Sequence, residues 1–294
     1  MPALIDEARA KVNLTLRVVG RRGDGYHDLE SVVAFADCAD RLTLTTGSDL
    51  TLNASGPRAP ECGAAADNLV IKAARLLAAR VDGVRLGAFT LDKQLPVAAG
   101  IGGGSADAAA ALRLLTRANA IEVDDPRVTE AARLTGADVP VCLSSRACVM
   151  TGVGETLRPL NLPTMPCLLV NPRVPVATSA VFAALGLRNG DLLVGATDVM
   201  RAPAWPVPDA SFDDWLDTLS AGVNDLEAPA MRIQPVIGDV LSALRAITGV
   251  RLARMSGSGA TCFAILDDHE LAQRAAQEVR RDHPTWWVHA GTLG

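Results

Sequence analysis

The stretch LPVAAGIGGGSADAAAAL, which begins at Leu95, joins a glycine cluster to a run of small residues with helical character. Gly100, Gly102, Gly103 and Gly104 fall within five consecutive positions. Each glycine weakens regular structure, because it loses more backbone freedom on folding than any other residue does. A bare backbone that leads into a helix can instead point N–H groups at an anion, and the helix dipole favours negative charge there. The segment therefore predicts a phosphate-binding loop.

The residues of the segment leave more than one kind of glycine loop open. A Walker A loop is excluded, because that pattern ends in Gly-Lys-Ser/Thr and no lysine lies here. Residues 100–105 resemble the GxGxxG loop of dinucleotide-binding folds, with serine in the last place. Glu122, Asp124 and Asp125 lie near the spacing expected for a ribose contact. Against that reading, a proline interrupts the direct entry from a strand, and a purely structural turn is the remaining alternative.

The elements around the loop are strands and helices in mixed order. Alternating patterns predict strands over 11–20, 41–46, 49–54, 87–96, 146–160 and 166–176, and a strand–glycine turn–strand unit over 251–266. Helical spacing predicts helices over 67–81 with Asp67 as N-cap, 105–119, a shorter one over 126–140 stopped by Gly136 and Pro140, 238–247 and 269–282. The proline-rich residues 201–212 are expected to form an exposed loop. The order lacks a steady strand–helix–strand rhythm, which favours an α+β fold over a doubly wound sheet.

Composition narrows the classes of function. The net charge of −5 and the lack of a basic tract argue against a nucleic-acid partner. No apolar run is long enough to cross a bilayer, and the N-terminus lacks the pattern of a secretory signal. The six cysteines are scattered without a CxxC pair, which argues against a zinc site or a disulfide scaffold and favours a reducing cytoplasm. We therefore expect a cytoplasmic protein with no dedicated metal ligands.

Three motifs resemble those of the GHMP kinases, the galactose, homoserine, mevalonate and phosphomevalonate kinases. PVAAGIGGGSADAA is similar to the second motif, close to P-x-G-x-G-L-G-S/G-S-S, with Ala98 and Ala106 replacing a glycine and a serine. ARAKVNLTLRVVGRRGDGYHDLES is similar to motif one and MSGSGATCFAIL to motif three, and LTGADVPVCL matches the segment of the catalytic aspartate. The similarity covers residues 8–266. It implies that the glycine loop wraps the triphosphate of ATP.

The resemblance also implies a fold and a division into domains. We expect a two-domain α+β GHMP kinase fold, with an N-terminal ATP-binding and catalytic domain over residues 1–160. A C-terminal ferredoxin-like domain would cover 161–294, with the active site in the cleft between the two. Mg²⁺ is expected to accompany ATP, although the sequence singles out no metal ligand. The oligomeric state is expected to be a monomer or a weak homodimer.

By the same resemblance, two charged residues carry the chemistry. Asp138 in GADVP is the base that takes the proton of the substrate hydroxyl, where composition alone would suggest a capping aspartate. Lys11 in AKVNL is its partner, an ammonium that keeps the carboxylate ionised and offsets charge on the moving phosphoryl group. Asn13 shares the strand face of Lys11 by two-residue alternation and is expected to orient the substrate.

The combination of AKVNL, GYH and GADVP resembles the GHMP kinases that act on an alcohol linked to cytidine diphosphate. It implies that the alcohol is a methylerythritol linked to cytidine diphosphate. Its 2-hydroxyl would be phosphorylated, as a step of non-mevalonate isoprenoid biosynthesis. Tyr26, the only tyrosine, would stack on the cytosine ring and His27 would hydrogen-bond the base. Phe182 would cover the other face of the ring, with Thr178 as a polar contact nearby. Phe182 could instead be a core residue.

The remaining expected contacts belong to the nucleotide. Asn68 and Lys93 fall where the family lines its adenine pocket. Ser105 either meets phosphate or Mg²⁺ or caps the helix, and the same oxygen would serve each role. The full set of expected nucleotide-binding residues is Asn68, Lys93, Pro96, Ala98, Gly100, Gly102, Gly103, Gly104 and Ser105.

Two other functions remain as alternatives. Another GHMP small-molecule kinase, of mevalonate or homoserine type, would not need the GYH loop. A non-catalytic nucleotide-binding sensor on the same fold would have no need to keep both Lys11 and Asp138. The aromatic residues and the charged pair therefore favour a kinase for a cytidyl substrate.

Overall fold

The computed structural model describes residues 3–47, 49–193, 206 and 210–294. Contacts divide the chain into two compact units that interleave along the sequence. The first unit comprises residues 1–11, 38–97 and 102–145, and the second comprises 12–37, 98–101 and 146–294. The single boundary near residue 160 stays a prediction. Of the proline-rich stretch 201–212, residues 201–205 and 207–209 lie outside the described residues.

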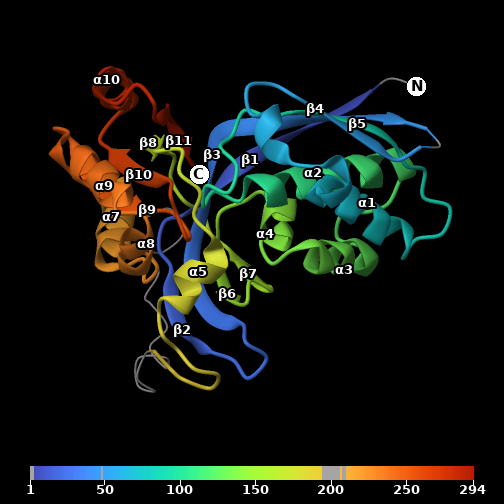
Figure 1. Cartoon of the computed structure of the whole chain (residues 1–294), viewed down its shortest axis with the longest axis horizontal. Coiled ribbons are helices and arrows are strands. Elements are labelled where there is room, and N and C mark those ends of the chain that lie inside the picture. Colours follow the sequence, from blue (N-terminus) through green and yellow to red (C-terminus); the bar gives the residue numbers. More distant parts are fainter. Residues whose placement is uncertain (1–2, 48, 194–205, 207–209) are drawn as a thin grey trace. The chain divides into compact units, whose positions relative to one another are not determined.

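In the described part of the first unit, four α-helices pack beside a small sheet (Figure 1). The antiparallel partner of the second half of β3 is β5, with Arg41 opposite Asp92, and β4 runs parallel to β5. The helix α2 contacts α1, α3 and α4. Its alanines from Ala108 to Ala111 are fully buried, because small side chains let neighbouring helices approach closely. The elements are the start of β1 (Leu4–Asn13), the second half of β3 (His27–Thr46), β4 (Thr51–Ser55), β5 (Gly87–Asp92), α1 (Leu69–Ala78), α2 (Gly103–Asn119), α3 (Pro126–Thr135) and α4 (Val139–Ser144).

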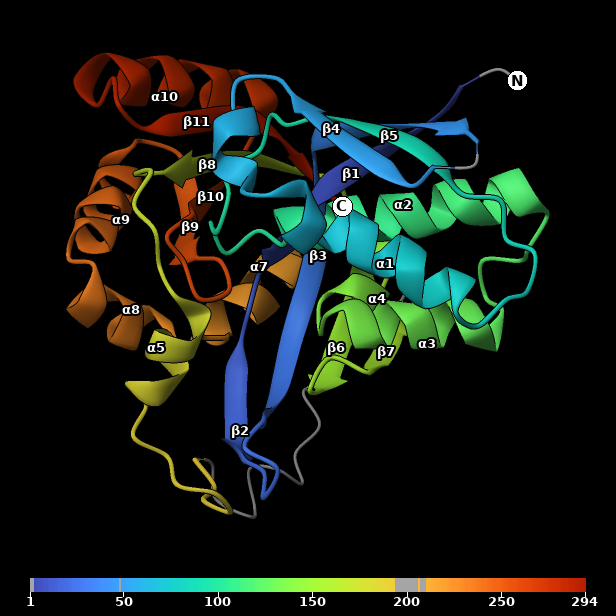
Figure 2. The same ribbon diagram turned by 45° about the vertical axis from the view of Figure 1, so that its right-hand side comes forward.

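Four strands of the second unit pair antiparallel in the order β11-β8-β10-β9, and β11 also pairs with β3 at Leu293 and Ala36. With α8 and α9 after β8 and α10 after β10, this is the ferredoxin-like arrangement that the resemblance predicts. Figure 2 shows α9 and α10 beside this sheet, and both contact it. α10 buries Ala272, Ala275, Ala276 and Val279, the spacing of a helix with one apolar face. The elements are β8 (Met165–Asn171), α8 (Glu227–Ile233), α9 (Val236–Ala246), β9 (Val250–Met255), β10 (Cys262–Leu266), α10 (His269–Asp282) and β11 (Trp287–Leu293).

The rest of the second unit is built on the first half of β3. β2 and β6 each pair antiparallel with it, and β7 pairs with β6. Two short helices, α5 and α7, complete the described part of this unit. The bounds are β2 (Arg17–Arg21), β6 (Cys148–Gly152), β7 (Thr156–Pro159), α5 (Thr178–Ala183) and α7 (Phe212–Ala221).

The structure corrects several predicted element ends. The expected strand over 11–20 is two strands, because the Leu16 N–H leaves the sheet pattern and donates to the Val223 carbonyl. α1 is capped by Asn68 rather than Asp67, since a 3₁₀ turn takes up residues 65–67. Pro140 lies in the first turn of α4 and does not stop a helix there, because a proline at the start of a helix lacks only an N–H that would be unpaired anyway.

Candidate active site

Lys11 and Asp138 form an ion pair in the first unit. Lys11 Nζ lies 3.0 Å from Asp138 Oδ2. The Lys11 side chain is buried, whereas 38% of the Asp138 side chain is exposed. A carboxylate of this kind is held by a cation on one side and is accessible on another. The pair therefore has the arrangement needed to accept a proton and to offset negative charge.

Asp138 lies between α3 and α4, at the N-cap of α4. An aspartate in this position usually accepts a hydrogen bond from an N–H of the first turn. Asp138 makes no such capping bond among the described residues. Pro140, at the second helical position, lacks one of the two N–H groups that an N-cap side chain uses. The Asp138 carboxylate therefore pairs with Lys11 and does not cap its own helix.

Cys142 lies one turn after Asp138 in α4 and is buried. Burial, reinforced by the nearby Asp138 charge, raises the pKa of the Cys142 thiol to about 12. A thiol in that state is not a nucleophile at neutral pH, because the thiolate is the reactive form. This leaves the Asp138 carboxylate and the Lys11 ammonium as the groups of this site that are suited to chemistry.

The glycine loop uses a left-handed backbone at three positions. The φ angles are 51° at Ala98, 75° at Gly100 and 63° at Gly102. A Cβ on Gly102 would lie 3.2 Å from Lys11 Cε, so this glycine also leaves room for the lysine stem. Ala98 stands where the GHMP pattern has glycine, and the left-handed conformation costs a non-glycine residue about 1–2 kcal/mol.

The helix α2 begins at Gly103, two residues earlier than the predicted start at Ser105. Two of the four glycines are therefore in the first helical turn rather than in the loop. The N–H groups of Gly103, Gly104 and Ser105 have no acceptor within a helix that starts there. These groups lie at the positive end of a 17-residue helix. This end of α2 fits the triphosphate of a nucleotide, because it offers several donors and a favourable dipole.

Lys93 is at the centre of a buried cluster of three charges. Its Nζ lies 2.6 Å from Asp40 Oδ2 and 2.5 Å from Asp107 Oδ2. Burial raises the pKa of Asp107 to about 7, against the opposing effect of Lys93, and the Asp40 charge adds to the rise. The two carboxylates raise the pKa of Lys93 although burial alone would lower it. The cluster therefore holds a lysine that stays charged between two competing carboxylates.

This cluster supports the glycine loop at both ends. Asp40 Oδ1 accepts hydrogen bonds from the N–H groups of Gln94 (2.6 Å) and Leu95 (2.8 Å), where the loop begins. Asp107 belongs to the second turn of α2, where the loop ends. The expectation that Lys93 contacts adenine stays a prediction, and its ammonium is already held by two carboxylates. Asp40 and Asp107 were missed, although a lone carboxylate within a run of buried alanines is a signal that could have identified Asp107.

In the second unit, Asn13 is hydrogen-bonded to a residue of the third motif, which is distant in the sequence. Its N–H donates to Ser256 Oγ at 3.1 Å, and its Nδ2 donates to Ser31 Oγ at 2.7 Å. Ser256 Oγ in turn donates to the carbonyl of Gly100 at 2.9 Å. A Cβ on Gly100 would lie 2.6 Å from the Ser256 carbonyl, so only glycine fits here. The third motif therefore fixes Asn13 and the start of the glycine loop together.

The turn of the third motif, which joins β9 and β10, is held by further polar contacts. Asn224 Nδ2 donates to the carbonyls of Met255 (2.7 Å) and Gly257 (2.9 Å). Thr178 Oγ1 lies 2.9 Å from Ser258 Oγ. Thr178 was predicted as a substrate contact, and the structure places it at this turn. Asn224 was missed, because nothing in its local sequence marks it.

The predicted base-binding residues lie in one region of the second unit. His27, at the start of β3, stacks on Phe182 of α5 with ring centroids 4.6 Å apart and planes inclined by 29°. Tyr26, in the turn before β3, is 62% exposed. Phe182 is partly buried against the core of this unit. The structure thus brings His27 and Phe182 together and leaves the Tyr26 ring open to solvent.

The His27 ring has an unused polar atom. Its Nε2 is buried and has no hydrogen-bond partner among the described residues. Burial, with a smaller effect of the Arg21 charge, lowers the pKa of His27, so the imidazole is neutral at pH 7. A neutral ring offers one donor and one acceptor nitrogen. An orphaned ring nitrogen beside the Phe182 ring fits a ligand with a polar, flat base.

Three other predicted nucleotide contacts have definite local environments. Asn68 Oδ1 accepts from the Val70 N–H at 2.9 Å, so this side chain caps α1. Pro96 is buried and Ser105 is partly exposed in the first turn of α2. Their contacts with a nucleotide stay predictions. No group of three or more His, Cys, Asp or Glu side chains among the described residues could hold a metal ion.

Comparisons with known proteins identify the family of the chain. Residues 68–146 match the GHMP kinases N terminal domain and residues 211–285 the GHMP kinases C terminal domain. Proteins named 4-diphosphocytidyl-2-C-methyl-D-erythritol kinase from Bradyrhizobium diazoefficiens and Nitrobacter winogradskyi are 71% and 70% identical over 293 residues. Each alignment covers 100% of this chain, and 99% and 95% of those proteins respectively.

A solved structure extends the agreement to the fold. The crystal structure of a 4-(cytidine 5'-diphospho)-2C-methyl-D-erythritol kinase is 36% identical, with a TM-score of 0.75 and coverage of 99% of both chains. In the part of this chain that the structure describes, no helix has both the length and the apolar character to cross a membrane. The chain belongs to the GHMP kinase family, together with relatives named 4-diphosphocytidyl-2-C-methyl-D-erythritol kinase.

Proposed function

We propose that this chain transfers the γ-phosphoryl group of ATP to the 2-hydroxyl of 4-diphosphocytidyl-2-C-methyl-D-erythritol. The products are the 2-phosphate and ADP, and the step belongs to non-mevalonate isoprenoid biosynthesis. The observation that carries the proposal is the ion pair of Lys11 Nζ and Asp138 Oδ2 at 3.0 Å, in the same unit as the N-terminus of α2. The identity of the substrate is inferred from relatives of about 70% identity over the full chain, which are named as kinases for this compound.

In this reaction the substrate oxygen attacks the γ-phosphorus while the bond to the ADP oxygen breaks. Asp138 takes the proton of the hydroxyl, and Lys11 offsets the charge on the transferred group. The N–H groups at the start of α2 hold the triphosphate in place, so that the protein supplies mainly position and electrostatic stabilisation. Mg²⁺ would neutralise charge on the phosphates, held chiefly by phosphate oxygens and water, with Ser105 as a candidate protein ligand.

The cytidyl group is assigned to the second unit. Tyr26 and Phe182 would stack on the two faces of cytosine, and His27 Nε2 would hydrogen-bond its polar edge. Asn13 and Thr178 would add polar contacts to the same substrate. What supports this assignment is the orphaned His27 nitrogen beside an aromatic ring. Since His27 stacks on one face of Phe182, cytosine would stack on the other face of that ring or take the place of His27 there.

The remaining assignments complete the proposal. Asn68 and Lys93 would line the adenine pocket, and Pro96 and Ala98 would belong to the loop that wraps the triphosphate. The protein would act in the cytoplasm as a monomer or a weak homodimer. The N-terminal domain would extend to residue 160.

A coupled assay of ADP release across several alcohols tests the proposal. The protein should consume ATP with the cytidyl methylerythritol substrate and not with mevalonate or homoserine. Turnover of mevalonate without turnover of the cytidyl compound would assign a different GHMP kinase. No turnover with any alcohol, while ATP still binds, would favour the sensor.

A further inference from the structure

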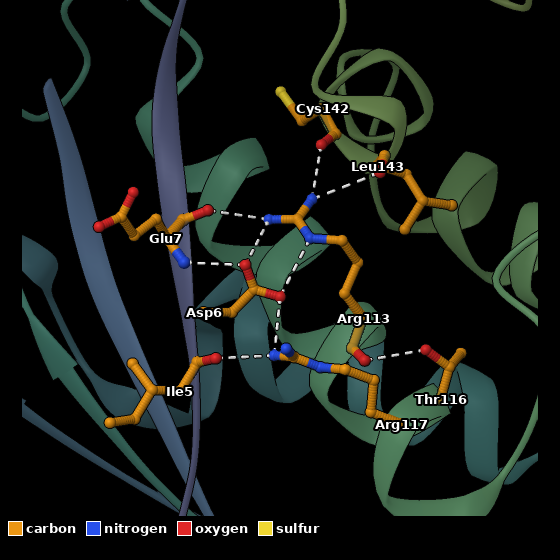
Figure 3. A network of polar contacts seen from close by, with 8 residues as sticks. All are labelled: Ile5, Asp6, Glu7, Arg113, Thr116, Arg117, Cys142 and Leu143. Atoms are coloured by element: carbon orange, nitrogen blue, oxygen red, sulfur yellow. Dashed lines mark hydrogen bonds and ion pairs between the residues drawn. The ribbon is translucent and has the colours of Figure 1, made fainter. Parts of the chain in front are cut away.

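Arg113 joins three elements of the first unit through a single guanidinium. It lies on α2 and contacts β1 and α4 (Figure 3). Its Nη2 donates to the Glu7 carbonyl at 2.9 Å and its Nη1 donates to the Cys142 carbonyl at 2.8 Å. Nε and Nη2 lie 3.2 and 3.3 Å from the two carboxylate oxygens of Asp6, and Nη1 lies 3.4 Å from the Leu143 carbonyl.

Each of the three elements carries part of the candidate active site at a distance from Arg113. β1 carries Lys11 five residues after Asp6, which is about 16 Å along an extended strand. α2 starts at the glycine loop, about 15 Å from Arg113 at the helical rise. α4 has Asp138 at its N-cap, and Arg113 holds the carbonyls at its other end. The contacts of Arg113 with β1 and α4 thus lie away from Lys11 and Asp138 themselves, at Asp6 and Glu7 and at the last residues of α4.

The short helix α4 needs such an anchor. It has six residues, and isolated helices shorter than about 12 residues are marginal in water. Its last carbonyls receive no hydrogen bond from an N–H group of the helix itself, and a cation beside them is favourable. The direction of α4, and hence the position of Asp138, depends on what holds this end.

Arginine suits this role better than lysine. The guanidinium is a planar fork with five N–H donors, and here it meets a carboxylate and backbone carbonyls of two elements at once. The Arg113 and Asp6 side chains are only 18% and 16% exposed, so solvent screens the ion pair less than it would at the surface.

We infer that Arg113 is a positioning residue for catalysis: it fixes β1 and α4 on α2 so that Lys11 and Asp138 keep their separation. The inference rests on the proposed role of the Lys11–Asp138 pair. It gives Arg113 an effect on turnover without any contact with substrate. A second arginine offers a matched control, since Arg117 contacts Asp6 (3.0 Å) and the Ile5 carbonyl (2.8 Å) on β1.

The experiment compares Arg113→Met, Arg113→Lys and Arg117→Met in the full chain, below their measured thermal midpoints. Arg113→Met should lower kcat by roughly 10- to 100-fold, because small misplacement of reacting groups costs that much. KM for ATP and for the cytidyl substrate should change by less than about 3-fold, because binding residues are unaltered. Arg113→Lys should recover part of kcat, and Arg117→Met should keep kcat within about 3-fold of wild type.

A double variant separates positioning from general stability. In an Asp138→Asn background, Arg113→Met should lower the residual kcat by less than about 3-fold, since effects of residues that act as a unit are not additive. Additive losses, equal losses in Arg113→Met and Arg117→Met, or an unchanged kcat in Arg113→Met would overturn the inference while leaving the proposed function intact. Full turnover in Asp138→Asn alone would instead show that the proposed base is wrong, and the inference would fall with it.

Discussion

The first unit contains two lysine–carboxylate clusters that differ in exposure and in composition. Lys11 pairs with one carboxylate, Asp138, of which 38% of the side chain is exposed. Lys93 pairs with two, Asp40 and Asp107, and all three side chains are at most 3% exposed. A buried charge without a partner is costly, whereas an exposed carboxylate can be hydrated. The comparison indicates that the Lys93 cluster maintains the loop and that the Lys11 pair is available for chemistry.

Removal of each lysine should therefore have different consequences. Lys93→Met leaves two buried carboxylates without their cation and should lower the free energy of unfolding by about 3–5 kcal/mol. Lys11→Met leaves a hydrated Asp138 and should lower it by less than about 1 kcal/mol, while turnover is lost. Urea unfolding of both variants checks this difference. Equal losses of stability would show that exposure does not distinguish the clusters.

The pH dependence of stability should come from the buried cluster. The pKa of Asp107 is raised to about 7 from its ordinary value of 3.8. Between these values the unfolded chain has released this proton while the folded chain retains it. Stability from this group is therefore complete at low pH and is lost as pH rises through the window, by up to about 1.4 kcal/mol per pH unit.

Urea unfolding of wild type and Asp107→Asn from pH 5 to pH 8 measures this effect. The difference in unfolding free energy between the two proteins should change with pH in the direction that disfavours wild type at higher pH. Parallel curves would mean that Asp107 is already ionised in the folded protein throughout the range.

Gly102 and Gly104 should respond differently to alanine, because they differ in backbone conformation and in what a Cβ would meet. Gly102 has φ of 63° and lies against the Lys11 stem, so Gly102→Ala should cost about 1–2 kcal/mol of stability and weaken ATP binding. Gly104 is helical, and a Cβ there meets only Leu69 at the ordinary distance of 3.7 Å. Gly104→Ala is the control and should leave stability unchanged or slightly higher. Isothermal titration with an ATP analogue measures the affinity of both variants and of wild type. Equal affinities of Gly102→Ala and wild type would mean that the loop backbone does not hold the nucleotide.

The residues of the exposed pair could be predicted from the sequence, because each lies in a short motif. The glycine loop and the ferredoxin-like arrangement were predicted on the same basis. The buried cluster could not be predicted, since the partners of Lys93 are brought to it by pairing of β3 with β5 and by the start of α2. The stacking of His27 on Phe182 depends on tertiary packing in the same way. Strand β11 was missed because its register is set by β8 rather than by a local alternation.

Single-turnover phosphoryl transfer by Asp138→Asn tests the central claim most directly. Asparagine keeps the shape of the side chain but cannot take a proton, so the rate of the chemical step should fall by roughly 10²- to 10⁴-fold while ATP binding persists. A rate equal to that of wild type, with the cytidyl substrate bound, would contradict the assignment of this carboxylate as the base.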